Sequence, residues 1–355
     1  MVHKAMSYRR VAVVVEAGRR MLALSTVEGL VPGPGEVTVR MSAAGVSYGD
    51  ILARVGVLPG SGRPGYVPGF DVTGTVEALG ASVAGLAVGQ PVTGLLPHGG
   101  YAEVVCVPAD LLLPLPDGVA PTDAAAAALN YFVAYQMLHR VAKPRSGGRI
   151  LAHGAGSGVG RALVELGRRA GLEVYGTASR AKDEAAALGA VPIDYRTDDF
   201  VSVVRDAGGV DAAFDAIGGT HFFASYRTLR RGGTLVGFGV SSAWSGGKAK
   251  GPRAGLSLLG LLGSNILPDG RHARFYTASR AIKRPDTYRE DLGTILELLA
   301  QKEIHPKIAA VLPLSQADHA HELVERGQVS GKVVLTPDPG PPAVSTTNEP
   351  AEPGG

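Results

Sequence analysis

The segment Arg149–Gly160, RILAHGAGSGVG, decides how this chain is expected to fold. Its first five residues predict a strand, a glycine-rich turn follows, and Val159–Ala170 predicts a helix. Such a turn directs backbone N–H groups and the positive end of a helix dipole at an anion, typically a pyrophosphate. The glycines miss the G-x-G-x-x-G spacing but supply the small residues that a backbone ligand needs. They are Gly154, Gly156, Gly158 and Gly160. A tight turn without a ligand is the alternative interpretation.

The end of the next predicted strand, Leu172–Ala178, indicates which dinucleotide would bind. Sites that prefer NAD usually place a carboxylate there for the ribose 2′-hydroxyl. Here no carboxylate precedes Asp183, and a hydroxyl and two cations stand in its place: Ser179, Arg180 and Lys182. Because a 2′-phosphate needs such donors, the sequence favours NADPH over NADH. The alternative for the two cations is a solvated start of a helix.

Strands and helices alternate from about residue 128 to residue 267, which predicts a doubly wound parallel sheet of the Rossmann type. Two later strands end in the glycine-containing segments Asp215–Gly219 and Gly237–Gly239. Both ends are expected on the carboxyl edge of the sheet, where ligands bind. Ile217 in the first segment is therefore a candidate cofactor contact.

The regions before and after this predicted parallel sheet have a different sequence pattern. Residues 8–127 contain β-branched runs between Pro/Gly turns, which is typical of an antiparallel barrel. A helix is expected through Ala124–Leu129, capped by Thr122 or Asp123. We expect residues 268–337 to pack back on 1–127 and complete that domain. Residues 338–355 are Pro/Gly/Ser/Thr-rich and predict a disordered tail. The predicted class is α/β, a β domain plus a Rossmann domain.

Composition excludes several classes of protein. The 355 residues are 45% hydrophobic and 19% charged, so the chain can build a large core. The net charge of +3 without a basic stripe argues against a nucleic-acid partner. The single Cys106 allows no internal disulfide, which fits a cytoplasmic location. The most apolar stretch, Leu256–Leu262, is too short to span a membrane.

Several motifs occur together and in a particular order. They are Pro68–Val76 (PGFDVTGTV), the turn 154–160, Thr177–Ser179, Ile193–Arg196 (IDYR), and Ala320–Leu323 (AHEL) leading to Gly331–Leu335 (GKVVL). With them the chain, from about Tyr8 to Pro337, resembles the quinone oxidoreductase and enoyl reductase branch of the medium-chain dehydrogenase/reductase superfamily.

The resemblance implies a GroES-like β domain completed by the C-terminal segment, an inserted Rossmann domain, and an active site in the cleft between them. It implies NADPH, with the pyrophosphate on Ser157, Gly158 and Val159, next to Gly156. The 2′-phosphate would lie near Ser179, Lys182 and Tyr195, and the nicotinamide would face Phe238, Gly239 and Val240. It also implies a homo-oligomer, for which we expect a homodimer, and a small-molecule substrate.

The resemblance bears on metals as well. Zinc-dependent relatives carry a Cys after the third strand and a Gly-His-Glu motif at the start of a later strand. Here those places hold Ser47 and Gly69-Phe70-Asp71, and the cysteines of a structural zinc lobe are missing too. We therefore expect no metal. His98 beside glycines is interpreted as a loop residue rather than a ligand.

Relatives show Asn-Tyr/Phe-x-Asp after the third strand. This chain has Ser47-Tyr48-Gly49-Asp50, so Ser47, Tyr48 and Asp50 are the candidate catalytic residues, and Tyr48 is favoured to bind substrate. A packing tyrosine is the alternative for Tyr48; Asn130 and Tyr131 are further candidates. Polar positions of relatives are here occupied by Leu52, Leu58 and Val133, so the proton donor stays open and solvent is the other source.

The favoured interpretation is a metal-free, NADPH-dependent reductase of a quinone or an α,β-unsaturated carbonyl compound. Two alternatives remain. One is a specialised natural-product tailoring enzyme on the same fold, with a redox-neutral cyclisation as one option. The other is a non-catalytic NADPH-binding protein. Oxidation of NADPH in the presence of quinones and enones separates the three.

Overall fold

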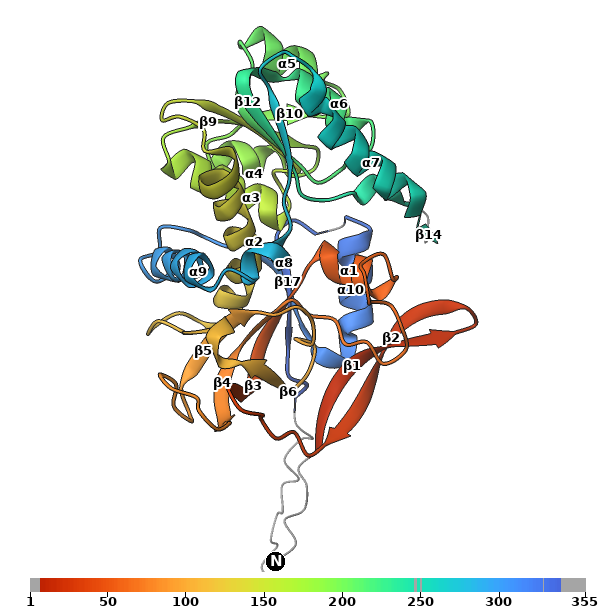
Figure 1. Ribbon diagram of the computed structural model, residues 1–355, viewed down its shortest axis with the longest axis vertical. Coiled ribbons are helices and arrows are strands. Elements are labelled where there is room, and N and C mark those ends of the chain that lie inside the picture. Colours follow the sequence, from red (N-terminus) through yellow and green to blue (C-terminus); the bar gives the residue numbers. More distant parts are fainter. Residues whose placement is uncertain (1–6, 246–247, 250, 328, 340–355) are drawn as a thin grey trace, which may run out of the picture.

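The computed structural model describes residues 7–245, 248–249, 251–327 and 329–339. A parallel sheet with its helices forms one part of the molecule, a largely antiparallel sheet forms the other, and helix α2 (Pro121–Tyr135) runs between them (Figure 1). The predicted fold class is thus confirmed. Most of the expected disordered tail lies outside the described residues.

The parallel sheet has six strands in the order β10-β9-β8-β11-β12-β15. Their bounds are β8 (Arg149–His153), β9 (Glu173–Ala178), β10 (Val191–Asp194), β11 (Val210–Asp215), β12 (Leu229–Gly237) and β15 (His272–Phe275). The strand order reverses between β8 and β11, so their carboxyl ends flank the crevice where doubly wound sheets bind ligands. Strand β15 pairs with β12 and carries this sheet beyond residue 267, where the sequence placed the end of the domain.

Alternate residues of the central strand β8 face two different cores. Ile150 and Ala152 pack with helix α3 and with α2, whereas Leu151 packs with helices α6 and α7. This alternation explains why the three central residues of the strand are all apolar: both faces are covered. The helices of this part are α3 (Gly158–Arg169), α4 (Lys182–Ala187), α5 (Phe200–Asp206), α6 (His221–Arg227) and α7 (Gly251–Gly263), with the short turns η3 (Ser241–Ala243) and η4 (Ser264–Ile266).

The second sheet has the order β16-β17-β3-β4-β5-β7, with β6 paired to β3. Its strands are β3 (Glu36–Val46), β4 (Asp71–Leu79), β5 (Pro91–Leu95), β6 (Val104–Pro108), β7 (Leu112–Pro114), β16 (Ile308–Pro313) and β17 (Lys332–Thr336). Strand β17 pairs antiparallel with β3, so the C-terminal strand lies beside a strand of the N-terminal region. A hairpin of β1 (Ser7–Glu16) and β2 (Arg19–Glu28) precedes it.

The remaining helices cover and connect the sheets. They are α1 (Tyr48–Arg54), η1 (Ala109–Leu111), η2 (Gln136–Ala142), α8 (Ala278–Ile282), α9 (Pro285–Ala300), η5 (Leu314–Gln316) and α10 (Ala317–Glu325). Helix α2 begins two residues earlier than a cap at Thr122 would place it. Ala120 is its N-cap residue and provides no side-chain cap, while Pro121 occupies the first helical position, where its missing N–H costs nothing.

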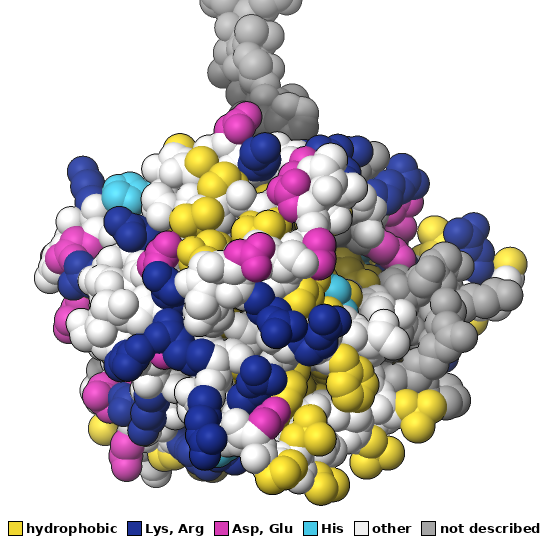
Figure 2. Space-filling model, turned by 90° about the horizontal axis from the view of Figure 1, so that it is seen from above, with side chains coloured by type: hydrophobic (Ala, Val, Ile, Leu, Met, Phe, Trp, Pro, Cys, Tyr) yellow, Lys and Arg dark blue, Asp and Glu magenta, His cyan; other side chains and the backbone are white. Residues whose placement is uncertain are grey.

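The segment Ser241–Leu258 contains two short strands, β13 (Trp244–Ser245) and β14 (Lys248–Ala249), and the first half of α7. Apolar side chains of α7 and the following turn are exposed: Leu256, Leu259, Leu262, Ile266 and Leu267. Viewed from the parallel-sheet end, hydrophobic side chains gather near one edge of the molecule (Figure 2). Among the described helices, none is long and apolar enough to cross a bilayer.

Candidate cofactor site and catalytic segment

The turn between β8 and α3 places the backbone N–H groups of two residues at the start of a helix. Ser157 is the N-cap residue, and its Oγ accepts a hydrogen bond from the N–H of Gly160 at 3.1 Å. The N–H groups of Gly158 and Val159 occupy the first two helical positions, which have no partner within a helix. They and the positive helix end are what a pyrophosphate requires.

Three of the four glycines in the turn each have a different close neighbour, whereas Gly154 has a positive φ of 69°. A Cβ on Gly160 would overlap the carbonyl oxygen of Gly154, and one on Gly156 would overlap the Cβ of Ala181. A Cβ on Gly158 would overlap the side-chain amide of Asn130 on α2. The alternating spacing therefore reflects packing against three segments of this chain. Asn130, predicted as a further catalytic candidate, is buried and supports the turn.

The end of β9 forms a polar corner beside the turn. The hydroxyls of Ser179 and Tyr195 lie 2.9 Å apart, and the Tyr195 side chain is exposed. Lys182 is the first residue of α4, and neither it nor Arg180 forms an ion pair with any described residue. Arg196, by contrast, is paired with Asp194 at 2.8 Å. This corner therefore contains the hydroxyls of Ser179 and Tyr195 and two exposed cations, Arg180 and Lys182.

The loops after β11 and β12 are bonded to each other. The N–H of Phe238 donates to the carbonyl of Asp215 at 3.0 Å, and the N–H of Ser242 donates to the carbonyl of Ile217 at 2.8 Å. Gly239 lies against the backbone of Ala216, where a Cβ would not fit. Ile217 and the segment Phe238–Val240 are therefore neighbours at the carboxyl edge of the sheet.

The catalytic candidates Ser47 and Asp50 bond each other at the start of α1. The Asp50 carboxylate accepts from the Ser47 N–H at 2.8 Å, from the Ser47 hydroxyl at 2.6 Å, and from the N–H of Gly69 at 2.8 Å. Asp50 is fully buried, and burial raises its pKa against these hydrogen bonds and the charge of Lys332. This arrangement is a capping box, so both residues orient α1.

Tyr48 is the first residue of α1 and is half-buried. Burial raises the pKa of its hydroxyl, and the charge of Glu325 adds to the effect, so the group stays protonated and can donate a hydrogen bond. Tyr131 has another role, because it is buried and its hydroxyl donates to Glu165 at 3.0 Å. Tyr48 is thus the candidate that keeps an accessible donor.

The C-terminal segment contacts the turn, which the sequence did not predict. The hydroxyl of Ser330 donates to the carbonyl of Gly156 at 3.3 Å and to Glu184 at 2.9 Å. The Lys307 ammonium bonds both oxygens of Glu184 at 2.7 Å. These pairs lie 123 to 174 positions apart in the chain, so no local pattern reveals them.

Two family models match this chain. Residues 33–117 match the alcohol dehydrogenase GroES-like domain, and residues 188–335 match the family described as zinc-binding dehydrogenase. A human protein named synaptic vesicle membrane protein VAT-1 homolog is 31% identical over 324 residues, covering 87% of this chain and 80% of that protein.

Two solved structures are similar to this chain over nearly its whole length. A mycobacterial protein, Rv1454c, complexed with NADPH, shares 28% identity over 93% of this chain and all of that one, with a TM-score of 0.78. A quinone oxidoreductase from Pseudomonas syringae shares 26% identity with the same coverage and a TM-score of 0.79. This chain belongs to the medium-chain dehydrogenase/reductase superfamily, in its quinone oxidoreductase and enoyl reductase-like branch. It spans 65%, 59% and 52% of three other vertebrate VAT-1 homologs and homolog-like proteins.

Zinc-dependent members of the superfamily use three positions as catalytic zinc ligands. In this chain the residues at these positions make other contacts. Ser47 bonds Asp50, and Phe70 packs against the apolar core. Asp71 is fully buried, accepts from the N–H of Gly45 at 2.5 Å, and lies 3.8 Å from the ammonium of Lys332. Burial raises the pKa of Asp71 to about 6 against the charge of Lys332. Elsewhere in the described residues, one group could hold a metal: His153, Asp215 and His221.

Proposed function

We propose that this protein binds NADPH and reduces a quinone or an α,β-unsaturated carbonyl compound without a metal. The observation that carries the proposal is the pairing of an anion-binding turn with two unpaired cations at the end of β9, where no carboxylate stands. That combination suits a pyrophosphate next to a 2′-phosphate. The relatives solved with NADPH support it.

The proposal gives these residues the following roles. Gly158 and Val159 would bind the pyrophosphate through their N–H groups, with Gly156 and Ser157 shaping the turn. Four residues would bind the 2′-phosphate: Ser179, Arg180, Lys182 and Tyr195. Four others would contact the nicotinamide: Ile217, Phe238, Gly239 and Val240.

The chemistry requires an acceptor held against the nicotinamide. NADPH supplies a hydride, which adds to the β-carbon of an enone or to a quinone, and a proton completes the product. Tyr48 would donate a hydrogen bond to the substrate oxygen, while Ser47 and Asp50 position its helix. The apolar Leu52 and Val133 are buried and add no proton donor. Solvent is the other source of the proton.

Binding and turnover must be measured separately. Titration of the full chain with NADPH gives the dissociation constant, and the loss of NADPH absorbance with a panel of quinones and enones gives turnover. Tight binding without turnover of any acceptor would contradict the reductase and favour a non-catalytic or redox-neutral role. Absence of NADPH binding would contradict the whole proposal. The domain boundaries, a homodimer and a cytoplasmic location stay predictions.

A further inference from the structure

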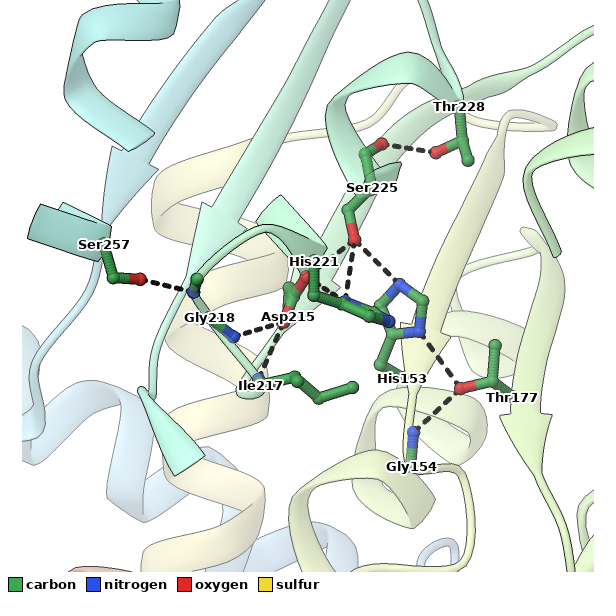
Figure 3. A network of polar contacts seen from close by, with 11 residues as sticks. His153, Gly154, Thr177, Asp215, Ile217, Gly218, His221, Ser225, Thr228 and Ser257 are labelled. Carbon is green, nitrogen blue, oxygen red and sulfur yellow. Dashed lines mark hydrogen bonds and ion pairs between the residues drawn. The ribbon is translucent and has the colours of Figure 1, made fainter. Parts of the chain in front are cut away.

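A chain of buried polar side chains runs beneath the carboxyl edge of the parallel sheet (Figure 3). It contains the last residue of β8, His153, the last residue of β11, Asp215, and two hydroxyls, Thr177 on β9 and Ser225 on α6. All four side chains are buried, at no more than 4% exposure. Such groups are costly to bury unless every one is hydrogen-bonded.

The chain begins at the turn. The N–H of Gly154 donates to the Thr177 hydroxyl at 3.2 Å, and that hydroxyl lies 3.1 Å from Nδ1 of His153. Nε2 of His153 lies 3.0 Å from Oγ of Ser225.

It ends at the loop after β11. The Ser225 hydroxyl donates to Oδ2 of Asp215 at 2.6 Å. Oδ1 of the same carboxylate accepts from the N–H groups of Ile217 at 2.7 Å and Gly218 at 3.2 Å. The path thus links two segments of the proposed cofactor site. One is the glycine-rich turn of residues 154–160, called here the pyrophosphate turn. The other is the segment of residues 215–219 after β11, called here the nicotinamide loop.

One assignment of protons satisfies every link. Ser225 has a single hydrogen, which it gives to Asp215, so its oxygen must accept the hydrogen on Nε2 of His153. Nδ1 of His153 then has no hydrogen and accepts from Thr177, whose oxygen accepts from Gly154. Burial lowers the pKa of His153 to about 4, which keeps the ring neutral as this assignment requires.

The Asp215 carboxylate is also contacted by a second histidine, His221. Nδ1 of His221 lies 2.7 Å from Oδ2 of Asp215, and its ring stacks on Phe200. Burial alone would raise the pKa of Asp215, but hydrogen bonds from His221 and Ser225 are among the causes that lower it to about 2. The carboxylate is therefore a fixed, ionised acceptor for the nicotinamide loop.

We propose that Thr177, His153, Ser225 and Asp215 are positioning residues that hold the pyrophosphate turn and the nicotinamide loop in one fixed geometry. The proposal rests on the proposed NADPH site and deepens it: residues that do not contact the cofactor would set the distance between its two binding segments. A substitution at Thr177 should then also change the backbone hydrogen bonding of Ile217 and Gly218.

Two other uses of these groups fit less well. Ser225 is fully buried and bonds the aspartate directly, so it lacks the exposure and the Ser-His-Asp order of a nucleophile. A metal on His153, Asp215 and His221 would use ligand atoms that all lie within 4.8 Å of one another. However, His153 would have to lose the hydrogen that Ser225 accepts.

The test compares Thr177→Val, which removes the hydroxyl at similar size, with Thr177→Ser, which keeps it. Amide hydrogen exchange of the apoprotein reports on residues 154–158 and 217–219, and titrations give the affinities for NADPH and NADH. For Thr177→Val we expect faster exchange in both segments and a loss of affinity of about tenfold for both nucleotides. Thr177→Ser should restore both properties. Lys182→Ala should leave exchange at 217–219 unchanged.

Other outcomes overturn the proposal. Exchange in Thr177→Val that rises only at 154–158 would mean that the two segments are independent. One zinc ion per chain in purified protein, lost in His221→Ala, would make the cluster a metal site instead. Failure of the wild-type protein to bind NADPH would contradict the proposed function, whereas the exchange measurement on the apoprotein would still decide the coupling.

Discussion

The side-chain amide of Asn130 occupies the place where a Cβ of residue 158 would stand. Asn130 lies on α2, and Gly158 begins α3 at the pyrophosphate turn. The absence of a side chain at this turn therefore serves the packing of α3 on α2 as well as the approach of a ligand.

We predict that Gly158→Ala weakens NADPH binding and lowers the free energy of unfolding by about 1–3 kcal/mol, the usual cost of overpacking. Adding Asn130→Ala should recover most of both losses, because it empties the contested space. Gly160→Ala is the matched comparison: its Cβ would meet the Gly154 carbonyl, which no side-chain change can remove. Thermal unfolding and NADPH titration measure both effects. No recovery in the double variant would disprove the role given to Asn130.

Lys182→Ala should weaken NADPH binding by about tenfold, since an unpaired cation beside a phosphate makes a charge-assisted bond. The affinity for NADH should change little, because NADH lacks the 2′-phosphate. Lys283→Ala, which removes an exposed lysine at the end of α8, is the control. Equal losses for both nucleotides would place the phosphate site elsewhere.

Tyr48→Phe tests the proposed hydrogen bond to substrate. Loss of a donor aimed at a developing charge lowers turnover by about tenfold or more, while NADPH affinity should stay unchanged. Tyr135→Phe, at a half-buried tyrosine whose ring packs on His139, controls for the loss of a hydroxyl. Unchanged turnover in steady-state assays would leave Tyr48 a packing role and solvent as the proton source.

The buried His321 leads us to predict how the free energy of unfolding depends on pH. It is fully buried, and burial, with a smaller contribution from Arg54, lowers its pKa to about 3. The unfolded chain takes up a proton on this residue near pH 6.5, whereas the folded protein does so only near its lowered pKa. Its contribution is therefore complete above about pH 6.5 and is lost as the pH falls toward 3, by at most about 1.4 kcal/mol per pH unit.

We expect His321→Gln to unfold with a shallower loss of stability between about pH 6 and pH 4 than the wild type. Urea unfolding at a series of pH values measures the slope. His98→Gln, at an exposed histidine, is the comparison. An unchanged slope in His321→Gln would show that other groups dominate the acid limb, among them His153, whose pKa burial lowers to about 4.

Local patterns were sufficient for much of the fold. Hydrophobic runs located β8, β9 and β11, and the turn between β8 and α3 followed from its glycines. Patterns were less informative where a segment is rich in glycine or very short. Helix α7 begins at Gly251, in a Gly/Lys-rich stretch for which no helix was predicted, and the leucines that follow continue this helix. Strand β15 has only four residues, too short for a periodic signal.

By itself, the sequence predicted the alternation of strands and helices, the glycine-rich turn after β8, and the lack of a carboxylate at the end of β9, because each depends on neighbours along the chain. Only the tertiary structure decided what surrounds the turn. It brought Asn130 and Ser330 against the turn, and it formed the path of hydrogen bonds from Gly154 to Asp215. The residues in these contacts are up to 174 positions apart in the chain. Such contacts depend on how whole sheets and helices pack, and no periodicity records them.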